Sequence, residues 1–196
     1  MLEIIEQNQG CNEIHIAPEY RENGVGRVVI RGVGNKVRID APKYCANLFL
    51  EVTGGASVDI EASCVFHGQN IHLLAPGHLR IGVGCGFNGH SIIQMHEPSS
   101  INIGAHSLFG GDTMVSSSHV HKIVDVKTGK RLNPPGDIVI GRHVWVSAGA
   151  SVWCGANIGA DSIVGKGTYV SKHFPANSLI AGNPARVIRE GVTWEF

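Results

Sequence analysis

The most regular feature of the chain is a hydrophobic position that recurs every six residues from Ile140 onward. The residues at this position are Ile140, Val146, Val152, Ile158, Val164 and Val170. An α-helix repeats its apolar stripe about every 3.6 residues and a strand every two, so a period of six fits neither alone. It fits a coil in which a short strand points one aliphatic side chain inward and a small residue accepts the turn. The repeat predicts an all-β solenoid, a parallel β-helix with about 18 residues per coil.

The same unit recurs upstream in a weaker form. Four segments share a template in which a central Ile is followed six residues later by Phe or Val, and these anchors are Ile60, Ile81, Ile103 and Ile140. They are separated by 21, 22 and 37 residues, and the last interval predicts two coils, one of them interrupted. The pattern fails near residues 119–137, where Lys127-Thr-Gly-Lys-Arg-Leu-Asn-Pro-Pro-Gly136 predicts an extruded loop. An insertion confined to one turn of a repeat protein usually lies on its binding face.

The repeat predicts a single domain over residues 1–196. We expect coils over 27–175, beginning with strands at 28–30 and 37–39, and a C-terminal cap segment over 176–196. The polar residues 1–26 are expected to cap the other end. A solenoid needs such caps because its last coil otherwise exposes its core and an unpaired strand edge.

Composition narrows the function classes. The 26 glycines and 6% aromatic residues suit the corners and the narrow interior of a prism. The formal net charge is zero, so nothing favours nucleic acid or an anionic membrane as a partner. The start of the chain has no basic region before a long apolar stretch, so we expect neither a signal peptide nor a transmembrane segment. Five scattered cysteines without a Cys-x-x-Cys pair predict reduced thiols and a cytoplasmic protein.

Three segments of the second half resemble the hexapeptide-repeat acyltransferases. They are Gly141-Arg-His-Val-Trp-Val146, Ala160-Asp-Ser-Ile-Val-Gly-Lys-Gly-Thr-Tyr-Val-Ser-Lys172 and Ala181-Gly-Asn-Pro-Ala-Arg-Val-Ile-Arg189. The resemblance is closest to the branch of galactoside, maltose and xenobiotic acetyltransferases and bacterial polysaccharide O-acetyltransferases. It implies a left-handed coil, although crossovers between parallel strands are nearly always right-handed. It also implies a homotrimer in which acetyl-CoA and a hydroxyl acceptor meet in a cleft between neighbouring prisms, with no metal.

The resemblance also implies a catalytic histidine where the coil gives way to the loop. The family often has Asp-x-His-x-Ile-x-Asp there, and this chain has His119-Val-His121-Lys-Ile-Val-Asp125. The match implies that His121 is the general base. His119 replaces the usual aspartate, a carboxylate that would fix the tautomer of His121. Asp112, Glu97 or a backbone carbonyl could take its place, and the sequence does not choose among them.

Other positions carry implied binding roles. For acetyl-CoA, Trp145 matches a tryptophan at the thioester end of the cleft. The remaining positions implied for the cofactor are Ala148 and Lys166 through their main chain, Ser171 and Lys172 near the nucleotide, and Arg186 and Arg189 on its phosphates. For the acceptor, the implied positions are Asn88, His90 and His119.

Four functions remain in competition at this level. The first is acetyl transfer to a saccharide, either a polysaccharide, its repeat unit or a free sugar. The second is acetylation of an antibiotic or another small molecule. The third is a γ-type carbonic anhydrase, because His90, His96, His119 and His121 could ligate a metal between subunits. The fourth is an inactive scaffold. The joint presence of His121, Trp145 and Arg186 argues against the scaffold, and Trp145 with the segment Ala181-Gly-Asn-Pro-Ala-Arg186 argues against the carbonic anhydrase. A saccharide acceptor is the first choice and a small-molecule acceptor the alternative.

Overall fold

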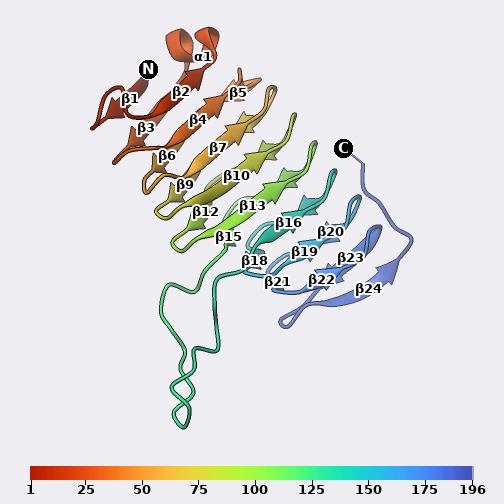
Figure 1. Cartoon of the computed structure of the whole chain (residues 1–196). Helices are drawn as coiled ribbons and strands as arrows, with labels where there is room; N and C mark the ends of the chain where they lie inside the picture. The colour runs from red at the N-terminus through yellow and green to blue at the C-terminus, as the bar shows by residue number, and fades with distance from the viewer. Residues whose placement is uncertain (196) are drawn as a thin grey trace.

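The chain forms a triangular prism of stacked coils whose three faces are parallel β-sheets (Figure 1). The computed structural model describes residues 1–195. Each face contains eight strands, and the strand order within a face follows successive coils rather than neighbours in sequence. The predicted parallel β-helix is therefore confirmed, and the prism has three edges, which we call A/B, B/C and C/A after the sheets that meet there.

The bounds of the strands are as follows. Sheet A contains β1 (Leu2–Glu6), β3 (Gly26–Ile30), β6 (Leu48–Val52), β9 (Gln69–Leu73), β12 (Ser91–Met95), β15 (Thr113–Ser116), β18 (Ser151–Trp153) and β21 (Tyr169–Val170). Sheet B contains β2 (Glu13–Ile16), β4 (Lys36–Ile39), β7 (Ser57–Ile60), β10 (Gly77–Ile81), β13 (Ser99–Ile103), β16 (Ile138–Ile140), β19 (Asn157–Ile158) and β22 (His173–Phe174). Sheet C contains β5 (Tyr44–Cys45), β8 (Val65–Phe66), β11 (Gly86–Phe87), β14 (Leu108–Phe109), β17 (Trp145–Val146), β20 (Ile163–Val164), β23 (Ser178–Ala181) and β24 (Arg186–Glu190).

The predicted anchors lie over one another in the core. Ile60 pairs with Ile81, Ile81 with Ile103, and Ile103 with Ile140, and each is at most 1% exposed. The phenylalanines six residues further on also stack. The ring centroids of Phe66 and Phe87 are 5.5 Å apart, and those of Phe87 and Phe109 are 4.7 Å apart. One inward side chain per strand therefore builds a continuous column through the coils.

The prediction of two coils between Ile103 and Ile140 is wrong. These residues are direct partners in sheet B, so the 37-residue interval is a single coil. Its additional length is the loop of residues 117–137, which leaves after β15, protrudes from the prism and returns to β16 (Figure 1). Residues in a loop do not follow the six-residue period, but they lengthen the interval between two anchors as a further coil would. The spacing of anchors alone therefore does not distinguish a second coil from a loop.

The expected cap over residues 1–26 is in large part a coil. β1 pairs with β3 and β2 pairs with β4, so both strands continue the sheets. The helix α1 (Pro18–Asn23) follows them, and its Tyr20 is buried in the core. At the other end, β23 extends sheet C and β24 closes it with an antiparallel pairing. This antiparallel last strand covers the edge of β23, which would otherwise be left unpaired at the end of the solenoid.

We expect Phe87→Ala to lower the free energy of unfolding by about 3–5 kcal/mol, because it removes the central ring of the buried phenylalanine stack and leaves a cavity. Phe49, which lies half-buried on β6, provides the control. Urea unfolding followed by circular dichroism measures both variants. An equal cost for Phe49→Ala and Phe87→Ala would contradict the assignment of Phe87 to the core.

Candidate functional site

The loop of residues 117–137 folds as a hairpin rather than an irregular excursion. The Asp125 amide donates to the Lys130 carbonyl at 2.9 Å, and the Leu132 amide donates to the Ile123 carbonyl at 2.8 Å. At the tip, the Asp125 carboxylate accepts bonds from the amides of Thr128 (2.8 Å) and Lys127 (3.0 Å). These bonds, those from Thr128 first, lower the pKa of Asp125. Asp125, which matches the end of the family motif, therefore caps the loop tip.

His121 lies at the base of this hairpin with its side chain exposed. Its amide donates to the His119 carbonyl at 2.6 Å, closing a γ-turn around Val120. Asn133 on the returning strand fixes the backbone on either side, because its Nδ2 donates to the His121 carbonyl at 2.9 Å and its Oδ1 accepts from the Ile123 amide at 2.6 Å. The main chain of His121 is held, while its imidazole faces solvent in the single chain.

His119 packs against the prism. Its ring is stacked on the indole of Trp153 from β18, with centroids 4.9 Å apart and planes 14° apart. Trp153 in turn lies 6.1 Å from the ring of Tyr169. His119 thus anchors the start of the loop on sheet A. Its expected contact with an acceptor stays a prediction.

Of the two carboxylates considered as partners for His121, one is bonded to other residues and one lies at another edge of the prism. Glu97, in the turn between β12 and β13, accepts two bonds from Arg131 at 2.6 and 2.7 Å and one from the Ser118 hydroxyl at 2.5 Å. These bonds, those from Arg131 first, hold the pKa of Glu97 at about 2. Asp112 lies at the C/A edge, where its amide donates to the His90 carbonyl, and not at the A/B edge from which the His121 loop leaves.

Trp145 lies on sheet C, the face of the prism opposite the A/B edge from which the His121 loop leaves. It is 38% exposed on β17 of sheet C, beside Val146, which points into the core. Trp194, near the end of the chain, packs next to it with ring centroids 6.1 Å apart, stacks on His143 at 4.4 Å and donates its Nε1–H to the His143 carbonyl at 2.9 Å. The Asp161 Oδ1 atom lies within hydrogen-bond distance of His143 Nδ1, at 3.1 Å. Sequence reasoning did not find this support, because Trp194 lies outside the six-residue repeat.

Four predicted residues lie along the C/A edge. Asn88 and His90 flank the turn between β11 and β12, and His90 Nε2 lies 3.2 Å from Asn70 Nδ2. Ala148 and Lys166 occupy the equivalent turn one coil apart, and the Gly167 amide donates to the Ala148 carbonyl at 3.2 Å. Successive coils therefore bring together residues that the sequence separates by up to 78 positions.

The remaining residues predicted for cofactor binding divide between two places. Arg186 and Arg189 are exposed on β24 in sheet C, where Arg189 pairs with Leu179. Ser171 and Lys172 lie between β21 and β22 at the A/B edge, the edge that carries the His121 loop. In one chain, the structure thus groups Trp145, Arg186 and Arg189 on sheet C and groups His121, Ser171 and Lys172 at the edge opposite to that sheet.

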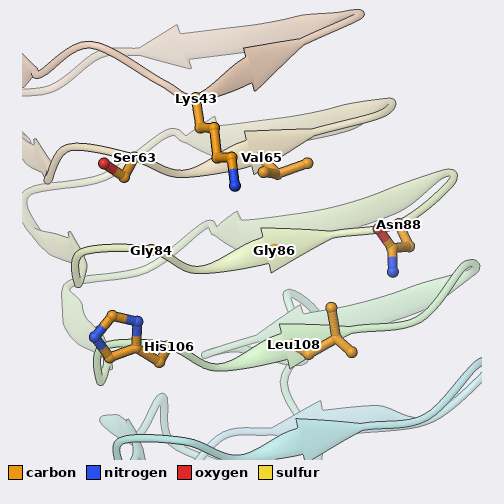
Figure 2. Close-up of a pocket in the computed structure, with 8 residues that line it drawn as sticks. All are labelled: Lys43, Ser63, Val65, Gly84, Gly86, Asn88, His106 and Leu108. Atoms are coloured by element: carbon orange, nitrogen blue, oxygen red, sulfur yellow. The ribbon is translucent and has the colours of Figure 1, made fainter. Parts of the chain in front are cut away.

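A hollow of about 410 Å³ lies on the outer face of sheet C, directly above Trp145 in the stack of coils. It is lined by Lys43, Ser63, Val65, Gly84, Gly86, Asn88, His106 and Leu108 (Figure 2). Gly86 creates it, because the neighbouring coils carry Val65 and Leu108 at the same register position. Lys43 extends over it toward the strand of Gly84 and Gly86. Of these residues, the sequence pointed only to Asn88.

Within residues 1–195, no three His, Cys, Asp or Glu side chains are grouped so that they could hold a metal ion. The same residues contain no helix of the length and hydrophobicity that a bilayer crossing needs.

Curated proteins that are similar in sequence include two bacterial O-acetyltransferases. The chain is 31% identical over 115 residues to the polysialic acid O-acetyltransferase of Escherichia coli O1:K1 / APEC, a match over 59% of this chain and 36% of that protein. It is 30% identical over 141 residues to the galactoside O-acetyltransferase of Escherichia coli strain K12, over 70% and 63% respectively. The chain therefore spans less than two thirds of the length of either relative.

A solved structure matches the whole fold. The crystal structure of the polySia-specific acetyltransferase NeuO covers 100% of this chain and 89% of its own, with a TM-score of 0.82 and 22% sequence identity. The expected left-handed β-helix is confirmed by this match. No protein-family model matches the chain.

Proposed function

Because this chain is related to hexapeptide-repeat O-acetyltransferases, we propose that it transfers an acetyl group from acetyl-CoA to a hydroxyl group of a saccharide. The observation that carries the proposal is one column on sheet C. Gly86, Leu108, Trp145, Ile163, Leu179 and Arg189 are partners in consecutive coils. Along this single face the hollow at Gly86, the exposed indole of Trp145 and the guanidinium of Arg189 therefore follow one another. This order matches that of an acceptor, the thioester of acetyl-CoA and its phosphate groups.

His121 acts as the general base in this proposal. A sugar hydroxyl is protonated near neutral pH, and an imidazole is the side chain best suited to take up its proton there. As the proton moves to His121, the hydroxyl oxygen forms a bond to the thioester carbonyl carbon. The carbon–sulfur bond then breaks, and His121 returns the proton to the sulfur of the leaving CoA. The activated thioester makes a covalent acyl-enzyme unnecessary.

A neighbouring subunit is needed to complete the site. Trp145 lies on sheet C, whereas the His121 loop leaves from the A/B edge, which is the edge opposite that face. We therefore propose a homotrimer in which sheet C of one prism faces the loop edge of the next. Ser171 and Lys172, which share the A/B edge with the loop, would then come from the same neighbour as His121.

Acetyl-CoA would lie along the lower part of the column. Trp145 would face its thioester, and Arg186 and Arg189 would pair with its phosphates, because guanidinium groups bind phosphate oxygens in a bidentate manner. Ala148 and Lys166 lie in neighbouring turns at the C/A edge, one coil apart. The main chain of these turns would therefore border the pantetheine arm of acetyl-CoA.

The acceptor would lie in the hollow above Trp145. Val65 and Leu108 on either side of Gly86 give it apolar walls, and its lining also includes the amide of Asn88, the hydroxyl of Ser63 and the ammonium of Lys43. A saccharide presents apolar ring faces and polar edges, so it matches such a lining. The Lys43 charge favours a sugar that carries a carboxylate, and the relative named for polysialic acid supports that choice.

We expect His121→Ala to lower kcat by roughly 10²–10⁴ while the KM for acetyl-CoA stays unchanged, because the lost group acts on the acceptor hydroxyl. Release of the CoA thiol is followed with acetyl-CoA and a panel of polysialic acid oligomers and galactosides. His173→Ala, which removes an exposed histidine on β22, is the control. Full activity in His121→Ala, or no saccharide-dependent release by the unaltered protein, would contradict the proposal.

We expect Gly86→Val to lower kcat/KM for the acceptor by about 10- to 200-fold, because a side chain on the floor excludes part of the sugar ring. The added Cβ meets only the Leu108 Cδ1 atom, at 3.0 Å, so the strand itself can accept it. The KM for acetyl-CoA and its slow hydrolysis without acceptor should not change. Asn157→Val, on the outer part of β19 in sheet B, is the matched control. Equal effects of the two variants on the acceptor would contradict this location.

A further inference from the structure

Glu97 joins the two ends of the loop that carries His121. Ser118, at the start of the loop, donates its hydroxyl to Glu97 Oε2, and Arg131, on the returning strand, donates from both terminal nitrogens to the two carboxylate oxygens. Both charged side chains are largely shielded from solvent, with 21% exposure for Glu97 and 22% for Arg131. A bidentate pair with this geometry fixes direction as well as distance. The two segments are therefore tied to one carboxylate on the rigid turn between β12 and β13.

The tied segment contains a strained residue directly before His121. Val120 has φ 60°, in the left-handed region that β-branched residues avoid. It is the central residue of the γ-turn between His119 and His121, and its amide donates to the Ser118 hydroxyl at 2.9 Å. Such a conformation is unfavourable for a β-branched residue and persists only where the surroundings impose it. The bonds of Ser118 to Glu97 and Val120 supply that constraint.

His119 provides a second attachment before the turn. Its ring stacks on Trp153, so the two residues that precede Val120 are held against the prism, Ser118 through Glu97 and His119 through sheet A. The charged groups facing Glu97 are Arg131, which bonds it, and Lys122, which also lowers its pKa. Because the pKa of Glu97 is so low, its carboxylate stays ionised well below neutral pH. The ion pair with Arg131 therefore persists over the pH range in which an imidazole can act as a base.

We propose that Glu97 is a positioning residue for His121: with Ser118 and Arg131 it forms a clamp that imposes the Val120 turn and so sets where the imidazole stands. The catalytic part of this inference rests on the proposed function. Glu97 acts through the main chain and not on the ring, which distinguishes it from a carboxylate that fixes the tautomer of the base.

The test compares Glu97→Gln with Glu61→Gln. Glu61 makes a similar half-shielded pair with Arg80 at 2.5 Å and accepts a bond from the Val83 amide, but it lies within the coils and away from the loop. We expect Glu97→Gln to lower kcat by about 10- to 100-fold with an unchanged KM for acetyl-CoA, because a catalytic group misplaced by about 1 Å costs roughly 10²-fold. Glu61→Gln should leave kcat unchanged and lower only the melting temperature.

Two further measurements separate positioning from general stability. Limited trypsin digestion should cut Glu97→Gln at Lys122, Lys127 or Lys130 faster than the unaltered protein or Glu61→Gln. In a His121→Ala background, Glu97→Gln should cause no additional loss of kcat, because the clamp acts only through that histidine. An additional loss in that background, or equal trypsin rates in all three proteins, would overturn the clamp. If the unaltered protein transfers no acetyl group, the proposed function fails, and the trypsin comparison still decides whether Glu97 holds the loop.

Discussion

The structure depends on the stacking of one inward side chain per strand over its counterpart in the next coil. The column from Ile60 to Ile140 and the rings of Phe66, Phe87 and Phe109 hold this register. A slip by one residue would turn these side chains outward, so the register is strongly determined. Because the inward positions are fixed, the outward ones are fixed with them. The alignment of Gly86, Leu108 and Trp145 on sheet C is a consequence of core packing.

The sequence predicted the part of the fold that follows from this constraint. The six-residue period and the Ile–Phe template identified the coils and predicted correctly that the segments of Ile60, Ile81 and Ile103 pair in succession. The prediction of two coils before Ile140 was wrong, because spacing does not distinguish a coil from an excursion. Residues 1–26, expected as a cap, also contain two strands, because β1 and β2 continue sheets A and B by pairing with β3 and β4.

The candidate site was less accessible to prediction, since its contacts cross coils and the loop. The stacking of His119 on Trp153 joins residues 34 positions apart, as does the bond between Glu97 and Arg131. The support of Trp145 by Trp194 depends on a tail outside the repeat. The hollow above Trp145 depends on the absence of a side chain at Gly86, which becomes informative only once Val65 and Leu108 are known to be its neighbours. Single residues that match a family motif, such as His121 and Trp145, could be identified from the sequence. The residues that contact them in the fold could not.

The central claim is that His121 and Trp145 act together across two subunits, since one chain carries them at an edge and on the face opposite to it. Co-expression of differently tagged His121→Ala and Trp145→Ala chains, with purification of the mixed oligomers, tests it directly. If each variant alone is nearly inactive, each mixed trimer should regain activity at about a third of its sites, because each site takes one residue from each of two neighbours and one interface of the ring then has both residues intact. Mixed oligomers no more active than the two variants measured separately would contradict the shared site.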